Sequence, residues 1–110
     1  MGAKHKGMVV WKNIEEILDY VFEKVIPCIS KKNYSLIDQM KRAATSIGAN
    51  FIEGYYSNST REFIKFLGYS RRSLAENEFW IEHCGRTRSI SNALLLELKD
   101  LLIRTGYLLD

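Results

Sequence analysis

Hydrophobic positions recur at three- and four-residue steps along four segments of the chain, which is the spacing of one face of an α-helix. The first stripe consists of Ile14, Ile17, Leu18, Val21, Val25 and Ile26, and the second of Ile37, Met40, Ala44, Ile47 and Phe51. The third segment has an inner face of Phe63, Phe66, Leu67, Ser70, Leu74, Asn77, Ile81 and Cys84. The fourth has Leu94, Leu95, Leu98, Leu101, Leu102 and Leu108. No alternating strand pattern of useful length competes with these stripes, so the sequence predicts an all-α protein.

Helix-start and helix-stop residues place the boundaries of these segments. Pro27 finishes or kinks the first helix, and Ser35 is a good N-cap for the second. The run Ser59–Glu62 is a capping box, and it opens a long third helix over roughly residues 60–87. Ser91 caps the fourth. Because short connections make sequential helices antiparallel neighbours, we predict an antiparallel up-down-up-down four-helix bundle.

Bulk properties are those of one globular domain. The 110 residues are 46% hydrophobic and 26% charged, with only one proline. We assign residues 1–8 to a flexible basic tail and residues 9–110 to the bundle. No apolar run approaches the roughly 18 residues needed to span a bilayer, so we expect a soluble cytoplasmic protein without membrane contact. In that compartment Cys28 and Cys84 are expected to be reduced.

The third helix carries the most suggestive charges. Arg61, Lys65 and Arg72 are spaced by four and seven residues, so they share one helix face. A basic face can bind phosphates with little reading of sequence. The candidate nucleic-acid-binding residues are Arg61, Lys65, Arg71, Arg72, Lys4 and Lys6, with Tyr55, Tyr56 and Tyr69 as stacking surfaces for unpaired bases. The net charge of +3 also fits the alternative, a solvated face with salt bridges between subunits.

Polar residues on or beside the apolar seams form a second candidate group. They are Gln39, Asn50, Glu53, Ser70, Ser73 and Asn77. We predict a structural hydrogen-bonded network that fixes helix register. The alternative is a buried pocket with Glu53 as general acid or base, but no nucleophile or partner base accompanies it. The Glu-x-x-His pattern of di-iron bundles is absent, because Trp80 precedes His83 by three residues. The sequence therefore predicts no enzyme, no metal site and no cofactor.

The segment from Leu36, LIDQMKRAATSIGANFIEGYYSNSTREFIKFLGYSRRSLAENEFW, resembles the four-helix-bundle family of 23S rRNA intervening-sequence proteins. The accessory variability determinant (Avd) proteins of diversity-generating retroelements are similar to the same family. The spaced pattern RAAxSIxxNxxEG, from Arg42 to Gly54, carries the resemblance, and Val10-Trp11 looks like the family's opening.

The resemblance implies a bundle that assembles into a ring-like homo-oligomer, often a pentamer. Its Avd branch implies binding of nucleic acid and a reverse-transcriptase-type partner protein. The aromatic content of 12%, more than four helices of this length bury, also predicts a subunit interface. Two functions remain open: an oligomeric scaffold that binds RNA or single-stranded DNA, and an interaction module that docks a partner protein without nucleic acid.

Overall fold

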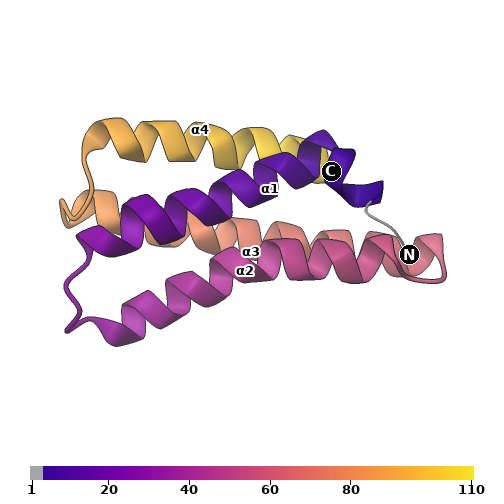
Figure 1. Ribbon diagram of the computed structural model, residues 1–110, viewed down its shortest axis with the longest axis horizontal. Helices are drawn as coiled ribbons and strands as arrows, with labels where there is room; N and C mark the ends of the chain where they lie inside the picture. The colour runs from indigo at the N-terminus through magenta and orange to yellow at the C-terminus, as the bar shows by residue number, and fades with distance from the viewer. Residues whose placement is uncertain (1–3) are drawn as a thin grey trace.

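Four antiparallel helices form the protein, and the sequence prediction of an up-down-up-down bundle is confirmed (Figure 1). The computed structural model describes residues 4–110, and no strand occurs among them. The helices are α1 (Val9–Tyr20), α2 (Tyr34–Tyr55), α3 (Thr60–Arg86) and α4 (Asn92–Leu109). Each helix packs on two neighbours, α1 on α2 and α4, and α3 likewise on α2 and α4, so α1 and α3 lie diagonally across the bundle.

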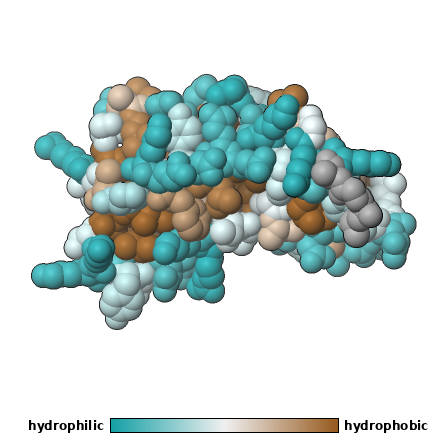
Figure 2. All heavy atoms as spheres, in the orientation of Figure 1, coloured by the Kyte–Doolittle hydropathy of each residue, from teal (hydrophilic) through white to brown (hydrophobic). Residues whose placement is uncertain are grey.

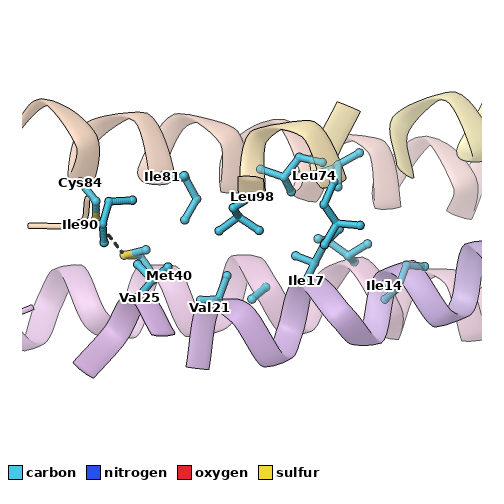
Figure 3. Close-up of a cluster of buried hydrophobic side chains, with 14 of the residues drawn as sticks. Ile14, Ile17, Val21, Val25, Met40, Leu74, Ile81, Cys84, Ile90 and Leu98 are labelled. Carbon is cyan, nitrogen blue, oxygen red and sulfur yellow. Dashed lines mark hydrogen bonds between the residues drawn. The ribbon is translucent and has the colours of Figure 1, made fainter. Parts of the chain in front are cut away.

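The core is built from the predicted stripes. Figure 3 shows Ile17 of α1 and Val21 of the turn that follows it pointing toward Leu74, Ile81 and Leu98 of α3 and α4. At one end of the core Cys84 Sγ lies 3.9 Å from Met40 Sδ, and Ile90 of the α3–α4 loop closes over them (Figure 3). Burying these side chains supplies most of the driving force for folding.

The first helix ends as Pro27 predicts, but through a wider turn than expected. Residues Val21–Val25 form a π-helical turn, and Ile26–Cys28 form a 3-10 helix with the proline at its start. Val21 and Val25 remain buried, while Cys28 is exposed and Cys84 is buried, both as free thiols. The π-turn keeps the apolar stripe facing the core up to the loop.

Two predicted helix starts are confirmed and one is wrong. Ser59 and Ser91 each accept a hydrogen bond from the backbone N–H three residues ahead, at 3.1 Å. Ser35, however, lies inside α2, which begins at Tyr34 with Asn33 at the N-cap and no side-chain cap. A turn in which Asn33 N donates to Ser30 O at 2.9 Å sets this start, so backbone geometry overrides the capping preference.

The predicted apolar face of α4 is wrong at Leu108, which is 49% exposed. Thr105 and Leu109 occupy the buried positions in this last part of the helix. Thr105 can be buried because its hydroxyl donates to Leu101 O at 2.7 Å within the helix. Helix geometry, and not hydropathy alone, therefore decides which residues face the core.

The expected flexible tail is a short 3-10 helix, η1 (Lys4–Gly7), over the part that the structure describes. His5 holds it against the end of α2, because His5 Nδ1 and the Tyr56 hydroxyl are hydrogen-bonded at 2.7 Å. The His5 ring also packs edge-on against Trp11, with centroids 4.7 Å apart. This aromatic contact was not predicted.

Helices α2 and α3 approach closely because small residues line their contact. A Cβ added at Gly54 would lie 2.7 Å from Phe66 Cβ and 3.3 Å from Phe63 O, so no larger residue fits. Ser70, fully buried on α3, donates to Ile47 O of α2 at 2.8 Å. Together these contacts fix the rotation of α3 and hence the side chains that it turns outward.

We expect Gly54→Ala to lower the free energy of unfolding by about 1–3 kcal/mol, because the new methyl group overpacks the contact with Phe66. Gly68→Ala is the matched control. A Cβ there meets only the end of Arg71, at 3.7 Å, so the change should stabilise the helix by about 0.5–1 kcal/mol. Urea unfolding followed by circular dichroism measures both. Equal stability of the two variants would contradict the close-approach argument.

Candidate nucleic-acid interface

The outward face of α3 holds three of the predicted cations together. Arg61, Lys65 and Arg72 are all exposed, and none of them forms an ion pair within residues 4–110. Tyr69 lies between the last two and contacts both. The Lys65 ammonium is 6.0 Å and the Arg72 guanidinium 5.6 Å from the centre of its ring. We call Arg61, Lys65, Tyr69 and Arg72 the α3 basic face.

Cation–π contacts at these distances restrain long side chains without neutralising them. Phe66 supports Tyr69 edge-on, with ring centroids 5.5 Å apart, and also lies under Lys65. Two cations are therefore positioned before any ligand arrives, which reduces the entropy lost when they bind phosphate.

Arg71 does not belong to this face, although the sequence grouped it there. Its guanidinium donates to Leu109 O at 2.9 Å and lies 3.6 Å from an Asp110 carboxylate oxygen. Arg71 therefore satisfies the C-terminal end of α4. Successive helix residues point about 100° apart, so Arg71 faces α4 while Arg72 faces outward.

The other residues predicted to contact nucleic acid lie outside the α3 basic face. Lys4 and Lys6 are exposed on η1, at the end of the bundle where α3 begins (Figure 1). Tyr55 and Tyr56 are half-buried in an aromatic cluster with His5, Phe51 and Phe63, so they serve packing. Of the predicted stacking residues, Tyr69 alone lies in the α3 basic face.

The predicted polar network is not one connected network. Asn50 and the buried Asn77 each donate to the carbonyl four residues earlier, Ser46 O at 2.9 Å and Ser73 O at 2.7 Å. Gln39 and Glu53 are exposed and so cannot form a buried pocket. Residues at the edge of an apolar stripe look buried from their spacing alone. Each helix packs on only two neighbours, however, and these cover a narrower arc of its surface. Only Ser70, with its bond to α2, joins two helices.

Glu53 does line an apolar groove between α1 and α2, of about 470 Å³. Trp11 and Leu18 form one wall, and Ala44, Gly48 and Ile52 form the other. Figure 2 shows hydrophobic residues in this groove beneath a hydrophilic row along α1. Exposed carboxylates gather on this side: Glu15, Glu16 and Asp19 lie on α1, and Glu23 lies in the turn that follows it. The acidic side of the molecule is thus diagonally opposite the α3 basic face.

Two titrating groups have displaced pKa values. A hydrogen bond from the Tyr20 hydroxyl to Glu97 links α1 to α4 and raises the pKa of Tyr20 above its ordinary value of 10.0. Burial raises the pKa of the Cys84 thiol. Within residues 4–110, no three His, Cys, Asp or Glu side chains are grouped to hold a metal ion, and no helix is long and apolar enough to cross a membrane.

The bundle and its surface define a class of small helical proteins, and comparison with known proteins assigns the family. The family model of the 23S rRNA-intervening sequence protein matches residues 6–110. The chain therefore belongs to this family, as the sequence resemblance indicated, whereas the relation to Avd proteins stays a prediction.

A solved structure has the same fold. It is a protein of unknown function from the S23 ribosomal protein family of Bacteroides thetaiotaomicron, 25% identical to this chain with a TM-score of 0.83. The match covers 92% of this chain and 94% of that one. No curated protein matches. The family carries no enzymatic assignment and its function is unknown.

The Tyr20–Glu97 hydrogen bond predicts a pH-dependent contribution to stability. A folded-state pKa above the unfolded value means that this contribution is complete below about pH 10 and is lost as the pH rises through the folded pKa. We expect Tyr20→Phe to remove this component, so that its Tm differs from that of the wild type at about pH 8 and the difference shrinks as the pH rises above 10.0. Thermal melts across this range test it. Parallel curves would show that the link does not contribute.

Proposed function

We propose that the protein is a non-enzymatic, oligomeric scaffold that binds single-stranded RNA or DNA through the α3 basic face. The observation that carries the proposal is the arrangement of Lys65 and Arg72 against the Tyr69 ring, with no carboxylate among residues 4–110 paired to either. Cations beside aromatic rings are the combination that unpaired strands use, since phosphates bind the charges and bases stack on planar groups. The membership in a family named for an rRNA intervening sequence agrees with this proposal.

The first test replaces Arg61, Lys65 and Arg72 with Glu. Because each substitution reverses a phosphate contact, affinity for a labelled single-stranded oligonucleotide should fall by more than about ten-fold at physiological salt. Fluorescence anisotropy measures the affinity. A matched control replaces Lys12, Lys41 and Arg42 with Glu, which gives the same net charge at other exposed positions that are in no ion pair within residues 4–110. Binding that survives the α3 substitutions, or falls equally in the control, would rule out the α3 basic face.

Assembly of several copies is supported by apolar side chains that the single chain leaves exposed. Val9, Ile103, Tyr107 and Leu108 are between 48% and 76% exposed, and we call them the α4 patch. Val9, Tyr107 and Leu108 line one hollow, and Ile103 and Tyr107 line the next, so the patch is continuous across the end of α4. A continuous apolar patch of this kind is typical of a subunit interface.

The oligomer is tested by replacing Ile103 and Tyr107 with Glu. Two charges in the α4 patch should oppose its burial against a second copy, so the species should shift toward the mass of one chain. Light scattering coupled to size-exclusion chromatography measures the mass. Because both side chains are exposed, helicity should not change. A wild-type protein that is already monomeric would refute the oligomer, and with it the ring of five subunits that the family resemblance implies.

A second candidate function is docking of a partner protein without nucleic acid, and the α1–α2 groove favours it. Its apolar walls and exposed carboxylates suit an amphipathic helix with basic residues beside its apolar stripe. The reverse-transcriptase-type partner implied by the resemblance belongs to this candidate. A purified complex that persists after nuclease treatment distinguishes it from the nucleic-acid scaffold.

A further inference from the structure

A second group of unpaired cations lies at the end of the bundle farthest from the α2–α3 turn. Lys31 and Lys32 lie in the α1–α2 loop, Arg86 ends α3, and Arg88 lies in the α3–α4 loop. All four are exposed, and none is in an ion pair with any residue from 4 to 110. We call them the loop-end cluster.

Both loops are anchored on the same end of the core. Ile29 of the first loop and Ile90 of the second belong to one buried cluster. Figure 1 shows the two loops together at the left end, and Figure 2 shows hydrophilic side chains projecting from that end. Two exposed carboxylates lie nearby, Glu23 in the π-turn and Asp38 near the start of α2. Glu82 is already in an ion pair, with its Oε2 3.3 Å from Lys99 Nζ. Four free cations thus exceed the free acids nearby.

Arg88 is held in a backbone conformation that usually belongs to glycine. Its φ is +58°, in the left-handed region, at the position just after the end of α3. Arg88 N donates to Gly85 O at 3.1 Å, and Ser89 N donates to Cys84 O at 2.9 Å, which completes the helix cap. A glycine would make the same cap without strain, so the structure keeps a charge here at a cost to the backbone.

An exposed aromatic accompanies the cations. Tyr34 begins α2, two residues after Lys32, and it is 71% exposed. A single-stranded nucleic acid uses both the cations and the ring, because its phosphates bind cations and its bases stack on exposed rings.

The surface of α3 connects this end to the α3 basic face. Arg72, Phe79 and Arg86 are spaced by seven residues, which is close to two helix turns, so the three share one face. Phe79 is 55% exposed between the two cations. From Arg72 to Arg86 the rise along the helix is about 21 Å. Glu76 and Glu82 flank this line: Glu76 accepts a hydrogen bond from Trp80 Nε1 at 3.2 Å, and Glu82 is in an ion pair with Lys99 at 3.3 Å.

We propose that the loop-end cluster, with Tyr34, is a second contact site for the same single strand. The strand runs along the outer face of α3, over Phe79, and onto the two loops. This inference rests on the proposed function, because it takes the α3 basic face as the first contact site. It adds a binding site from two loops that are far apart in the sequence.

The test compares Lys32→Ala/Arg88→Gly with the control Lys12→Ala/Arg42→Ala, which loses the same two unpaired charges at exposed positions outside both sites. The probe is a labelled oligouridine long enough to span α3, and anisotropy is measured across a salt series. Loss of two phosphate contacts should weaken binding about ten-fold and flatten the slope of log K against log salt by about 1.4. The control should keep the wild-type slope. Arg88→Gly should not lower Tm, because glycine relieves the strained backbone.

Tyr34 provides an independent measurement. Tyr34→Phe keeps the ring and should bind oligouridine as the wild type does, whereas Tyr34→Ala should weaken binding about ten-fold. Equal affinities of the two variants would overturn the stacking contact.

The outcomes separate the two proposals. A loop-end variant that binds as the wild type does, beside an α3 variant that does not bind, overturns the second site and leaves the proposed function intact. The converse result keeps the loop-end cluster and removes the α3 basic face. A folded wild type that binds no oligouridine at low salt overturns both and favours an acidic protein partner.

Discussion

The close contact between α2 and α3 determines most of what this protein can present to a ligand. Gly54 admits Phe66 at a distance that no side chain would allow, and Ser70 forms a buried hydrogen bond to a backbone oxygen of α2. A buried hydroxyl without its acceptor is costly, so rotation of α3 about its axis is opposed by polar as well as apolar terms. The direction of every outward side chain on α3 follows from this constraint.

Because the rotation of α3 is fixed, some of its charged side chains are bonded within the bundle and others stay free to bind a ligand. Arg71 is turned toward α4 and satisfies its last carbonyl, while Arg72, one residue later, rests on Tyr69 and keeps its charge free. The same rotation buries Asn77 and exposes Phe79. A helix with a nearly balanced composition therefore has one side that packs and one side rich in unpaired cations. Sequence composition averages over both sides and hides the difference.

Sequence periodicity predicted the fold class, the helix order and most of the core, because three- and four-residue spacing follows directly from helix geometry. It failed where the decisive contact is distant in the chain. Arg71 donates a hydrogen bond to Leu109 O, 38 residues away, and no local sequence pattern predicts this contact. Leu108 was assigned to the core because hydropathy ranks it above Thr105, whose hydroxyl is satisfied within its own helix.

Sequence spacing also predicted only part of the candidate nucleic-acid interface. Spacing by four and seven puts Arg61, Lys65 and Arg72 on one face of a helix, and the Tyr69 ring contacts the last two. The cations of the two loops were visible as residues, but their grouping needs the bundle topology, which places both loops at one end. The pattern of hydrophobic and polar residues did not predict the π-turn before Pro27 or the attachment of η1 through His5. These features depend on side-chain packing between segments and not on periodicity.

The diagonal placement of the acidic side of α1 and the basic side of α3 has a consequence for how net charge should be understood. The molecule is 22 Å across at its narrowest, whereas the field of an exposed charge decays over about 8 Å at physiological ionic strength. An object approaching one side is therefore screened from the other, and the formal charge of +3 describes neither. At low ionic strength the two fields overlap and the molecule orients as a transverse dipole. Near physiological salt it behaves instead as a two-faced particle, whose sides attract opposite classes of partner independently.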